Sequence, residues 1–339
     1  MGVTRASIGV LAVGTVLLLA AVSGCATAGP ASAPASAPAS CPSGTLVSTA
    51  SGLTDALAAA TPGTTVVLAD GRYEGRFTVA VSGTAAAPIT LCGASGAVLD
   101  GGGTDSGYTL HLQGASHWRL EGFSVSGGQK GVMLDGSSSN ALTGLTVSGT
   151  GDEAVHLRAG SSDNLVEKST ISGTGRSTAE FGEGVYVGSA QSNWCTISAC
   201  DPDRSDRNRI SGNTISGTTA EAIDVKEGTT GGQLLGNALD GSAATAVDSL
   251  IDVKGSDWVV SRNTGTAAPK DGAQVHVILD GWGARNAFDG NSFAVAASGY
   301  AVSIVGDARA AGNQVACDNR ATVAGADAPG RATNVTCVG

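Results

Sequence analysis

Short segments in which apolar and polar residues alternate recur along most of the chain. The most regular ones have the form apolar-x-apolar and begin at Ile89, Leu110, Val132, Val155, Val185, Ile223, Ile251, Val275 and Val302. The steps between them run from 21 residues (89 to 110) to 38 residues (185 to 223). A period of two is the pattern of a short β-strand with one buried face. The recurrence therefore predicts a chain built from repeated coils.

A second type of segment lies between these strands, as in "NALTGLTVSGT" and "NRISGNTISGT", and ends in a Gly/Ser/Thr turn. Several short strands per coil, joined by Gly and Asn turns, indicate an all-β fold, a single-stranded right-handed parallel β-helix (solenoid). In this fold each coil buries its apolar face against the next coil. A β-propeller or β-sandwich is the competing fold, but a propeller needs longer, more regular blades and usually more aromatic residues.

Asparagine recurs in or before the predicted turns. This residue tolerates left-handed backbone and can bond to neighbouring backbone groups. We therefore expect a structural role rather than a ligand role for Asn140, Asn164, Asn208, Asn237, Asn263 and Asn286.

The two ends of such a stack need covers, because they expose unpaired strand edges. Leu53, Ala56, Leu57 and Ala60 share one helical face, and Pro62-Gly63 would end that helix. We expect a short N-terminal capping helix and, from about residue 306, a C-terminal cap. The β-helix domain is predicted to span residues 41–339.

The first 40 residues read as targeting sequence and tether. Arg5 precedes an apolar run, which is typical of a secretory signal over residues 1–24. Its end, "VSGC", resembles a bacterial lipobox with Cys25 as the lipidated residue, although an ordinary signal peptide cut near "ATA" or a short membrane anchor would fit too. The Pro/Ala/Ser-rich residues 25–40 are expected to form a tether. The protein is thus predicted to be exported, either extracellular or held at the cell membrane by a lipid anchor alone.

Composition narrows the possible partners. The chain of 339 residues has 51 glycines without a Gly-X-Y period, which excludes collagen. A formal net charge of −10 and the absence of a basic patch argue against nucleic acid. We expect a monomer. Without Cys25, six cysteines remain, and an even number in an exported chain predicts disulfides. Proximity favours the pairs Cys195–Cys200 and Cys317–Cys337, which leaves Cys41–Cys92.

The stretch from residue 56 to residue 91 resembles a known family. Pro62-Gly63, Asp70-Gly71, Tyr73, Ser82-Gly83-Thr84 and Pro88-Ile89-Thr90 match the opening of right-handed β-helix proteins that act on carbohydrates. They are especially similar to the polysaccharide lyases related to chondroitinase B and alginate lyase. The resemblance implies a lyase that cleaves a uronate-containing polysaccharide by β-elimination.

Outward side chains of stacked strands should form rows across the coils. A second predicted row contains Arg158, Lys226 and Lys254, and the first consists, in order, of Thr90, His111, Met133, His156, Tyr186, Asp224, Asp252, His276 and Ser303. Just before them come Glu153, Glu183 and Glu221, which we expect in the turn that enters each strand, since glutamates would be costly in the core. We predict a groove that binds an acidic polysaccharide through His156, Tyr186, Asp224, Asp252 and His276. A merely solvated sheet face is the alternative.

In the lyases resembled here, a Glu five residues before a Lys binds calcium, and the Lys is the base. Glu221 and Lys226 have this spacing. The resemblance implies Ca²⁺ held by Glu221, Glu183 and Glu153, with Lys226 as base and Lys254 or Arg158 in place of an assisting arginine. The family's second acid would fall at Thr219, which departs from that pattern. Two stacked ammonium groups should lower at least one lysine pKa. A β-helix glycoside hydrolase and a noncatalytic glycan-binding or structural protein are the other hypotheses.

Overall fold

The computed structural model describes Gly2 and residues 41–339. The predicted signal segment, the lipidation site at Cys25 and the tether over residues 25–40 lie outside the described residues. In the part that is described, no helix combines the length and the apolar character needed to cross a membrane.

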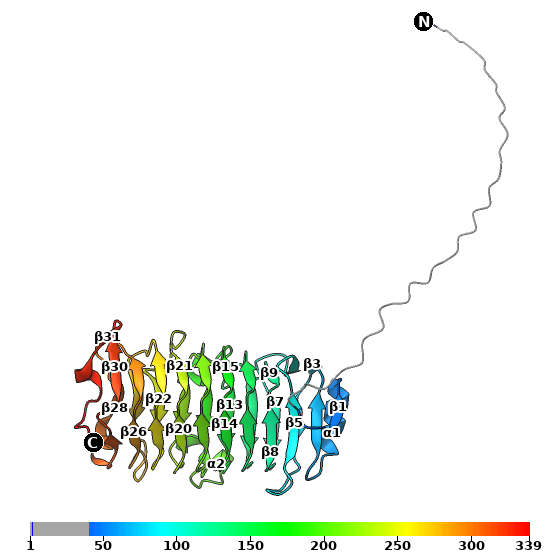
Figure 1. The fold of residues 1–339 in the computed structure, drawn as a ribbon, viewed down its shortest axis with the longest axis horizontal. Coiled ribbons are helices and arrows are strands. Elements are labelled where there is room, and N and C mark those ends of the chain that lie inside the picture. The colour runs from blue at the N-terminus through cyan, green and yellow to red at the C-terminus, as the bar shows by residue number, and fades with distance from the viewer. Residues whose placement is uncertain (1, 3–40) are drawn as a thin grey trace, which may run out of the picture. The chain divides into compact units, whose positions relative to one another are not determined.

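Short strands from successive coils pair in parallel to form three long sheets, and Figure 1 shows the coils stacked in chain order from β1 to β31. Sheet 1 contains β1 (Thr45–Val47), β2 (Thr65–Leu68), β5 (Ile89–Gly93), β8 (Trp118–Glu121), β11 (Ala141–Thr143), β14 (Leu165–Glu167), β17 (Arg209–Ser211), β20 (Gln233–Leu235), β23 (Val259–Ser261), β26 (Ala287–Asp289) and β29 (Gln314–Val315). Sheet 2 contains β4 (Phe77–Val79), β7 (Tyr108–Gln113), β10 (Lys130–Asp135), β13 (Val155–Arg158), β16 (Val185–Val187), β19 (Ile223–Val225), β22 (Ser249–Val253), β25 (Asp271–Val275) and β28 (Val302–Ile304). Sheet 3 contains β3 (Gly71–Glu74), β6 (Ala97–Asp100), β9 (Ser124–Ser126), β12 (Thr146–Ser148), β15 (Thr170–Ser172), β18 (Thr214–Ser216), β21 (Ala238–Asp240), β24 (Thr264–Thr266), β27 (Ser292–Ala294), β30 (Arg320–Val323) and β31 (Ala326–Asp327). This arrangement confirms the predicted all-β solenoid.

The core is a column of aliphatic side chains inside the coils. In sheet 2 the inward rows are fully buried, for example Leu134, Leu157, Val187, Val225 and Val253. The repeated "IDVK" segments stack directly, with Ile223 paired to Ile251 and Asp224 paired to Asp252. The prediction that these segments share one sheet is confirmed.

Two of the segments aligned in sequence do not occupy the predicted place. β5, which contains Thr90, belongs to sheet 1, and the first strand of sheet 2 is β4, where Thr78 pairs with His111. The prediction for Thr90 is therefore wrong. In β25 the register is shifted by two residues, so Gln274 rather than His276 pairs with Asp252. Small residues occupy this coil because Phe293 from sheet 3 fills the interior beside Gly272, where an added Cβ would lie 2.2 Å from the phenyl ring.

The asparagines have the structural role predicted for them, and the structure shows that they form buried ladders. In the longer ladder, Asn213, Asn237, Asn263, Asn291 and Asn319 are each at most 2% exposed. The Oδ1 of each residue after the first accepts from both the backbone N–H and the Nδ2 of the preceding asparagine. The side-chain amides thus satisfy turn backbone groups that the sheets leave unpaired.

Replacing Asn237 with alanine should lower the free energy of unfolding by about 3 kcal/mol, since it leaves several buried polar groups unpaired. The Asn237 amide accepts from Asn213 N–H at 3.0 Å and donates to the Ile210 carbonyl at 3.0 Å. Urea unfolding followed by circular dichroism is the measurement. Asn193→Ala, at an exposed asparagine, is the control and should change little. Similar midpoints for the two variants would contradict the structural role of the ladder.

The ends of the stack are covered. Helix α1 (Ala50–Ala58) buries Leu53 and Leu57, and Thr49 caps it by accepting from Gly52 N–H. At the other end β30 and β31 form an antiparallel pair, and η4 (Pro329–Arg331) follows.

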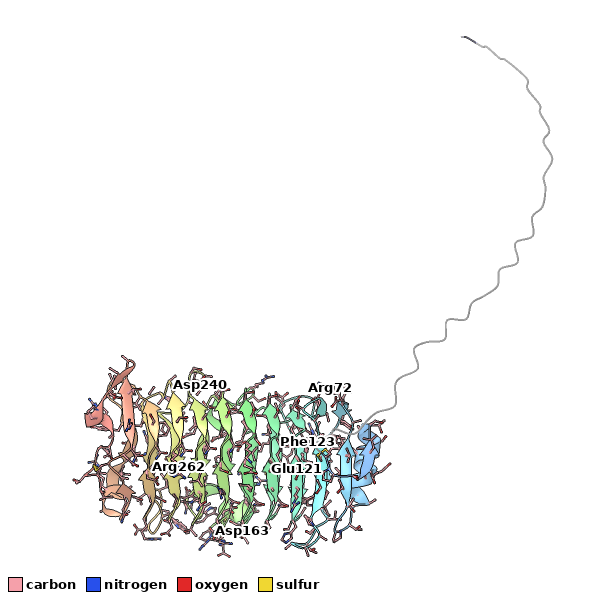
Figure 2. All side chains as sticks on the ribbon, in the orientation of Figure 1. Arg72, Glu121, Phe123, Asp163, Asp240 and Arg262 are labelled. Carbon is pink, nitrogen blue, oxygen red and sulfur yellow. A yellow bond between two sulfur atoms is a disulfide. The ribbon has the colours of Figure 1, made fainter. Side chains whose placement is uncertain are left out.

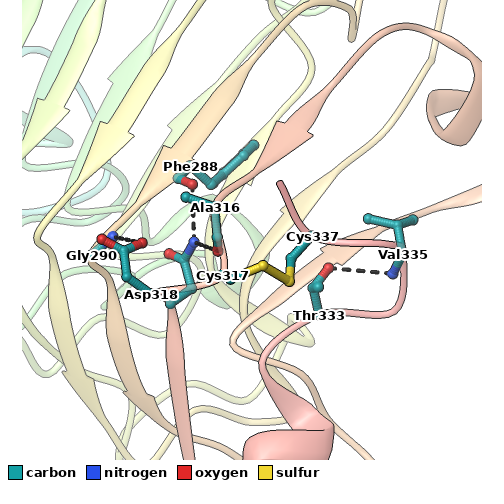
Figure 3. Close-up of a disulfide and its surroundings, with 9 residues drawn as sticks. Phe288, Gly290, Ala316, Cys317, Asp318, Thr333, Val335 and Cys337 are labelled. Carbon is teal, nitrogen blue, oxygen red and sulfur yellow. Dashed lines mark hydrogen bonds between the residues drawn. A yellow bond between two sulfur atoms is a disulfide. The ribbon is translucent and has the colours of Figure 1, made fainter. Parts of the chain in front are cut away.

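Three disulfides join the predicted partners: Cys41–Cys92, Cys195–Cys200 and Cys317–Cys337. Figure 3 shows the last of them, which ties the C-terminal segment to the chain just after β29, close to Asp318 and its hydrogen bond to Gly290 N–H. Disulfides of this number are typical of an exported protein.

Candidate active site

The outward face of sheet 2 carries three rows of side chains that run across the coils. The central row is His111, Met133, His156, Tyr186, Asp224, Asp252 and Gln274. The following row, two residues later in each coil, is Gln113, Asp135, Arg158, Gly188, Lys226, Lys254 and His276. The preceding row contains Lys130, Glu153, Glu183 and Glu221. These residues lie two positions before the buried residues Val132, Val155, Val185 and Ile223, respectively. As expected, all three glutamates lie in the turn before a strand.

Two lysines and two aspartates form a buried alternating cluster. Lys226 Nζ lies 2.5 Å from Asp224 Oδ2, and Lys254 Nζ lies 2.8 Å from Asp224 Oδ1 and 2.7 Å from Asp252 Oδ2. His276 Nδ1 extends the cluster at 2.9 Å from Asp252 Oδ1. His276 thus lies in the following row beside Lys254, and it joins the cluster through a different row from the one predicted.

The lysines do not show the predicted fall in pKa. Burial alone would lower the pKa of the Lys226 ammonium, but Asp224 and the neighbouring glutamates raise it above its ordinary value. The pKa of Lys254 is also raised, since Asp224 and Asp252 outweigh both burial and the repulsion from Lys226. In the protein without a further cation, both lysines are held as ammonium ions.

Asp224 also belongs to a group of three carboxylates, together with Glu183 and Glu221. One ligand oxygen from each of Glu183, Glu221 and Asp224 lies within 4.8 Å of the others. Glu183 Oε2 is buried and has no hydrogen-bond partner among the described residues. Burial and the charge of Asp224 raise the pKa of Glu221 to about 7, and burial together with Glu153 and Asp224 raises that of Glu183. Three carboxyl groups thus meet at a site where only Asp224 forms ion pairs with lysines, and this oxygen-rich triad can hold a metal ion.

Glu153 has different partners. It forms an ion pair with Lys130, and its Oε1 lies 3.3 Å from His156 Nδ1. Although burial alone would raise the pKa of Glu153, His156 and Lys130 lower it to about 2. The structure thus brings Glu183 and Glu221 together with Asp224, but it turns Glu153 toward Lys130 and His156. Thr219, at the position of the family's second acid, donates to the Ala179 carbonyl at 2.8 Å, and Glu183 from the preceding coil is the acid that joins Glu221 and Asp224.

The Tyr186 ring contacts both His156 and Lys226. Its ring stacks edge-on against His156, with ring centroids 4.5 Å apart, and Lys226 Nζ lies 4.9 Å from its centroid. Burial and the charge of Asp224 raise the pKa of the Tyr186 phenol well above its ordinary value. Tyr186 therefore keeps its proton and can donate a hydrogen bond into the groove.

The groove is hollowed over these rows. A hollow of about 600 Å³ is lined by Lys130, His156, Arg158, Glu183, Tyr186 and Lys226, among others. A second hollow of about 530 Å³ continues toward the N-terminal coils and is lined by Gln113, Asp135 and Arg158. Asn193, at the end of η2 (Gln191–Asn193), and Ile197, at the end of α2 (Trp194–Ile197), line both hollows and form one wall.

That wall is anchored by a buried acid that the sequence did not point to. Asp203 is 0% exposed and accepts from Ala159 N–H, Gly160 N–H, the Ser189 hydroxyl and the Ser205 hydroxyl, all at 2.8–3.0 Å. In the sequence, Asp203 is distinguished only by its position in the long segment between β16 and β17. Lys130 was missed too, although its place two residues before the buried Val132 could have shown it.

Comparisons with known proteins agree with this geometry. Residues 95–327 match the family described as right handed beta helix region, which also agrees with the predicted hand of the solenoid. An alginate lyase from Paenibacillus sp. str. FPU-7 is similar at 39% identity and a TM-score of 0.76, covering 83% of this chain and 95% of that one. A search of curated proteins found no match.

Two more distant structures share the fold. Pectate lyase Pel9A has 15% identity and a TM-score of 0.52, covering 81% of this chain and 72% of that one. PfbA, a surface adhesin of Streptococcus pneumoniae, has 14% identity and a TM-score of 0.57, covering 80% and 72%. At these identities the likeness concerns the fold alone.

Proposed function

Since the chain belongs to the right-handed β-helix family, we propose that it is an exported polysaccharide lyase that cleaves a uronate-containing polymer by β-elimination. The observation that carries the proposal is the convergence of the carboxylate triad, Lys226 and Tyr186 in one groove. The alginate lyase that is 39% identical supports the same reaction class.

β-Elimination removes the proton at C5 of a uronate, forms the C4=C5 double bond and breaks the C4–O bond to the leaving sugar. Lys226 is the proposed base, because its Nζ lies in the groove beside Tyr186 and the triad. Tyr186 keeps its phenol proton and can hydrogen-bond to a substrate oxygen, and His156 lies against its ring. The double bond leaves one new sugar end that absorbs ultraviolet light.

The triad fits a calcium site, because three carboxylates converge and the buried Glu183 Oε2 has no partner among the described residues. We propose that Glu183, Glu221 and Asp224 hold Ca²⁺, which when bound would neutralise the uronate carboxylate and so acidify the C5 proton. Asp224 also bonds to Lys226 and Lys254, so its charge is shared between the triad and the lysines. Lys226 can act as the base only after this ion pair loosens and its ammonium group has given up a proton to solvent.

Hydrolysis fits the geometry less well. Glycosidases place two carboxyl groups about 5–9.5 Å apart around the scissile bond. One oxygen from each of Glu183, Glu221 and Asp224 lies within 4.8 Å of the others, so these carboxylates are placed to share one cation rather than to flank a sugar bond from two sides.

The test is to incubate the exported protein with alginate, pectate, chondroitin and dermatan. We expect new ultraviolet absorbance and unsaturated ends with at least one polymer, alginate first. Reducing ends without ultraviolet absorbance would show hydrolysis. Binding without cleavage of any polymer would show a glycan-binding protein, and either result would overturn the proposal.

A further inference from the structure

One wall of the groove contains a disulfide between its own residues. The wall segment, residues 191–201, consists of η2, α2 and the turn that follows them, and its Asn193 and Ile197 line both hollows. Cys195 and Cys200 lie in this segment and are joined to each other. Both cysteines are exposed, so a thiol in solution can reach the bond between them.

The turn that this disulfide closes has a costly backbone conformation. Ala199 and Cys200 are consecutive, neither is glycine, and their φ angles are +56° and +70°. Left-handed backbone is unfavourable for residues with a Cβ, and Ala and Cys lack the short polar side chain that eases it in Asn and Asp. The link from Cys200 back to Cys195 holds this conformation. Opening the disulfide removes that restraint.

The hydrogen bonds of this turn are local. Ser198 N–H and Cys200 N–H donate to the Trp194 carbonyl, at 2.7 and 3.1 Å, and Asp201 N–H donates to the Ser198 carbonyl at 3.0 Å. The Ser198 hydroxyl donates to the Trp194 and Asp201 carbonyls. In the part of the chain that the structure describes, no hydrogen bond joins residues 195–201 to a strand of the solenoid. The turn is therefore held mainly by its own closure.

The chain on either side of the turn is, by contrast, fixed to the solenoid. Gln191 N–H donates to the buried Glu227 at 2.7 Å, and the Trp194 side chain is buried. After the wall segment, Arg207 forms a fork with Asp163, at 2.8 Å through both Nε and Nη2, and Figure 2 shows Asp163 at the lower margin of the solenoid. Opening the disulfide therefore frees the turn while its flanks stay in place.

We propose that the Cys195–Cys200 disulfide is a redox-sensitive clasp for the groove. Two equivalents of a small thiol reduce it by thiol–disulfide exchange: the S–S bond breaks, both cysteines become thiols, and the small thiol is oxidised to its own disulfide. Reduction releases Ala199 and Cys200 from left-handed backbone, so Ile197, three residues before Cys200, is no longer held as a wall. This inference rests on the proposed function and adds regulation of the same groove, with the oxidised protein as the tight-binding form.

Reduction should weaken substrate binding rather than the bond-breaking step. Lys226, Tyr186 and the carboxylate triad lie on strands of sheet 2 or in the turns beside them, so they keep their positions. A wall that the substrate must first put in order lowers affinity, because ordering side chains costs free energy. We expect KM to rise about fivefold and kcat to stay nearly unchanged.

The exported protein is treated with graded concentrations of dithiothreitol, and free thiols in one sample are alkylated and located by mass spectrometry. We expect Cys195 and Cys200 to be labelled at concentrations that leave the other two disulfides intact. At that point KM for the cleaved polymer should rise, and hydrogen exchange should increase in residues 191–201 but not in the strands. Oxidised glutathione should restore the original KM.

Three variants separate the clasp from a general loss of stability. Cys195→Ser/Cys200→Ser should have the raised KM permanently, with no response to dithiothreitol. Cys317→Ser/Cys337→Ser, which opens the disulfide at the C-terminal cap, is the matched control and should keep the wild-type KM and its response. If a serine variant fails to fold, Ala199→Gly decides the question. It removes the cost of left-handed backbone and keeps the disulfide, so its reduction should need more dithiothreitol.

Three results would overturn the inference: no selective reduction of Cys195–Cys200, an unchanged KM after its reduction, or unchanged hydrogen exchange in the wall segment. These differ from failure of the proposed function. If no polymer gives unsaturated ends, binding of an alginate hexasaccharide replaces KM as the readout. Binding that weakens on selective reduction would then refute the lyase and keep the clasp, and binding that is absent or insensitive to reduction would refute both. Unsaturated products with equal KM in the oxidised and reduced forms would keep the lyase and refute the clasp.

Discussion

Replacing Lys226 with alanine should lower kcat by about 10³-fold, because a positioned base contributes on this order. The fold should survive, since Asp224 retains an ion pair with Lys254 at 2.8 Å. KM should change little, because the proposed contact with the substrate carboxylate is made through a cation at the triad rather than through Lys226. The measurement is the initial rate of ultraviolet absorbance on the polymer that the wild-type protein cleaves.

Lys168→Ala is the control for this variant. Lys168 is exposed and lies between β14 and β15, whose strands belong to sheets 1 and 3 rather than to the groove. It should retain full activity. Equal rates for the two variants, or elimination that survives in Lys226→Ala, would remove Lys226 from the mechanism and favour Tyr186 or another group as base.

Removal of divalent cations should abolish the activity, and added Ca²⁺ should restore it. At a free concentration one hundred times its dissociation constant, the ion should stabilise the fold by about 2.7 kcal/mol and raise the melting temperature by about 4 °C. Because the pKa of Glu221 is raised to about 7, binding must displace a proton over the neutral range. Apparent calcium affinity should therefore rise as the pH rises from 6 to 8.

Glu221→Gln should abolish both the melting shift and the activity. Glu167→Gln, on β14 of sheet 1, is the matched control and should keep both. Full activity after chelation, together with no calcium-dependent melting shift, would show that Glu183 and Glu221 share protons instead of a metal ion.

The membership of the rows in the groove was largely predictable from the sequence, whereas the ion-pair partners of these residues were not. Alternation placed Asp224 outward and Ile223 inward, and the cost of buried glutamates placed Glu221 in a turn. Nothing in the spacing of Lys226 and Lys254 shows that Asp224 lies between their ammonium groups. The sequence therefore predicted mutual repulsion, although attraction to the aspartates dominates in the structure.

The pairing register of neighbouring strands was the second feature that the sequence could not predict. Period-two alternation is unchanged by a shift of two residues, so His276 and Gln274 are equivalent candidates for the row of Asp252. The structure pairs Gln274 with Asp252, and in this coil Phe293 leaves no room for a side chain at Gly272, where an added Cβ would lie 2.2 Å from its ring. The same limit applies to Thr90, whose segment alternates correctly but pairs within sheet 1.

The sequence by itself determined the repeated coil, the structural role of the turn asparagines, the capping helix and the disulfide partners, because these depend on local alternation, turn residues and the spacing of cysteines along the chain. Only the tertiary structure decided which coils lie in which register, which acids meet in the triad, and which loop walls the groove. Those features depend on contacts between residues from 20 to more than 40 positions apart, such as Asp203 with Ala159 and Glu183 with Asp224. Packing of the solenoid interior and the lengths of the turns set those contacts, and neither can be predicted from a single segment of the sequence.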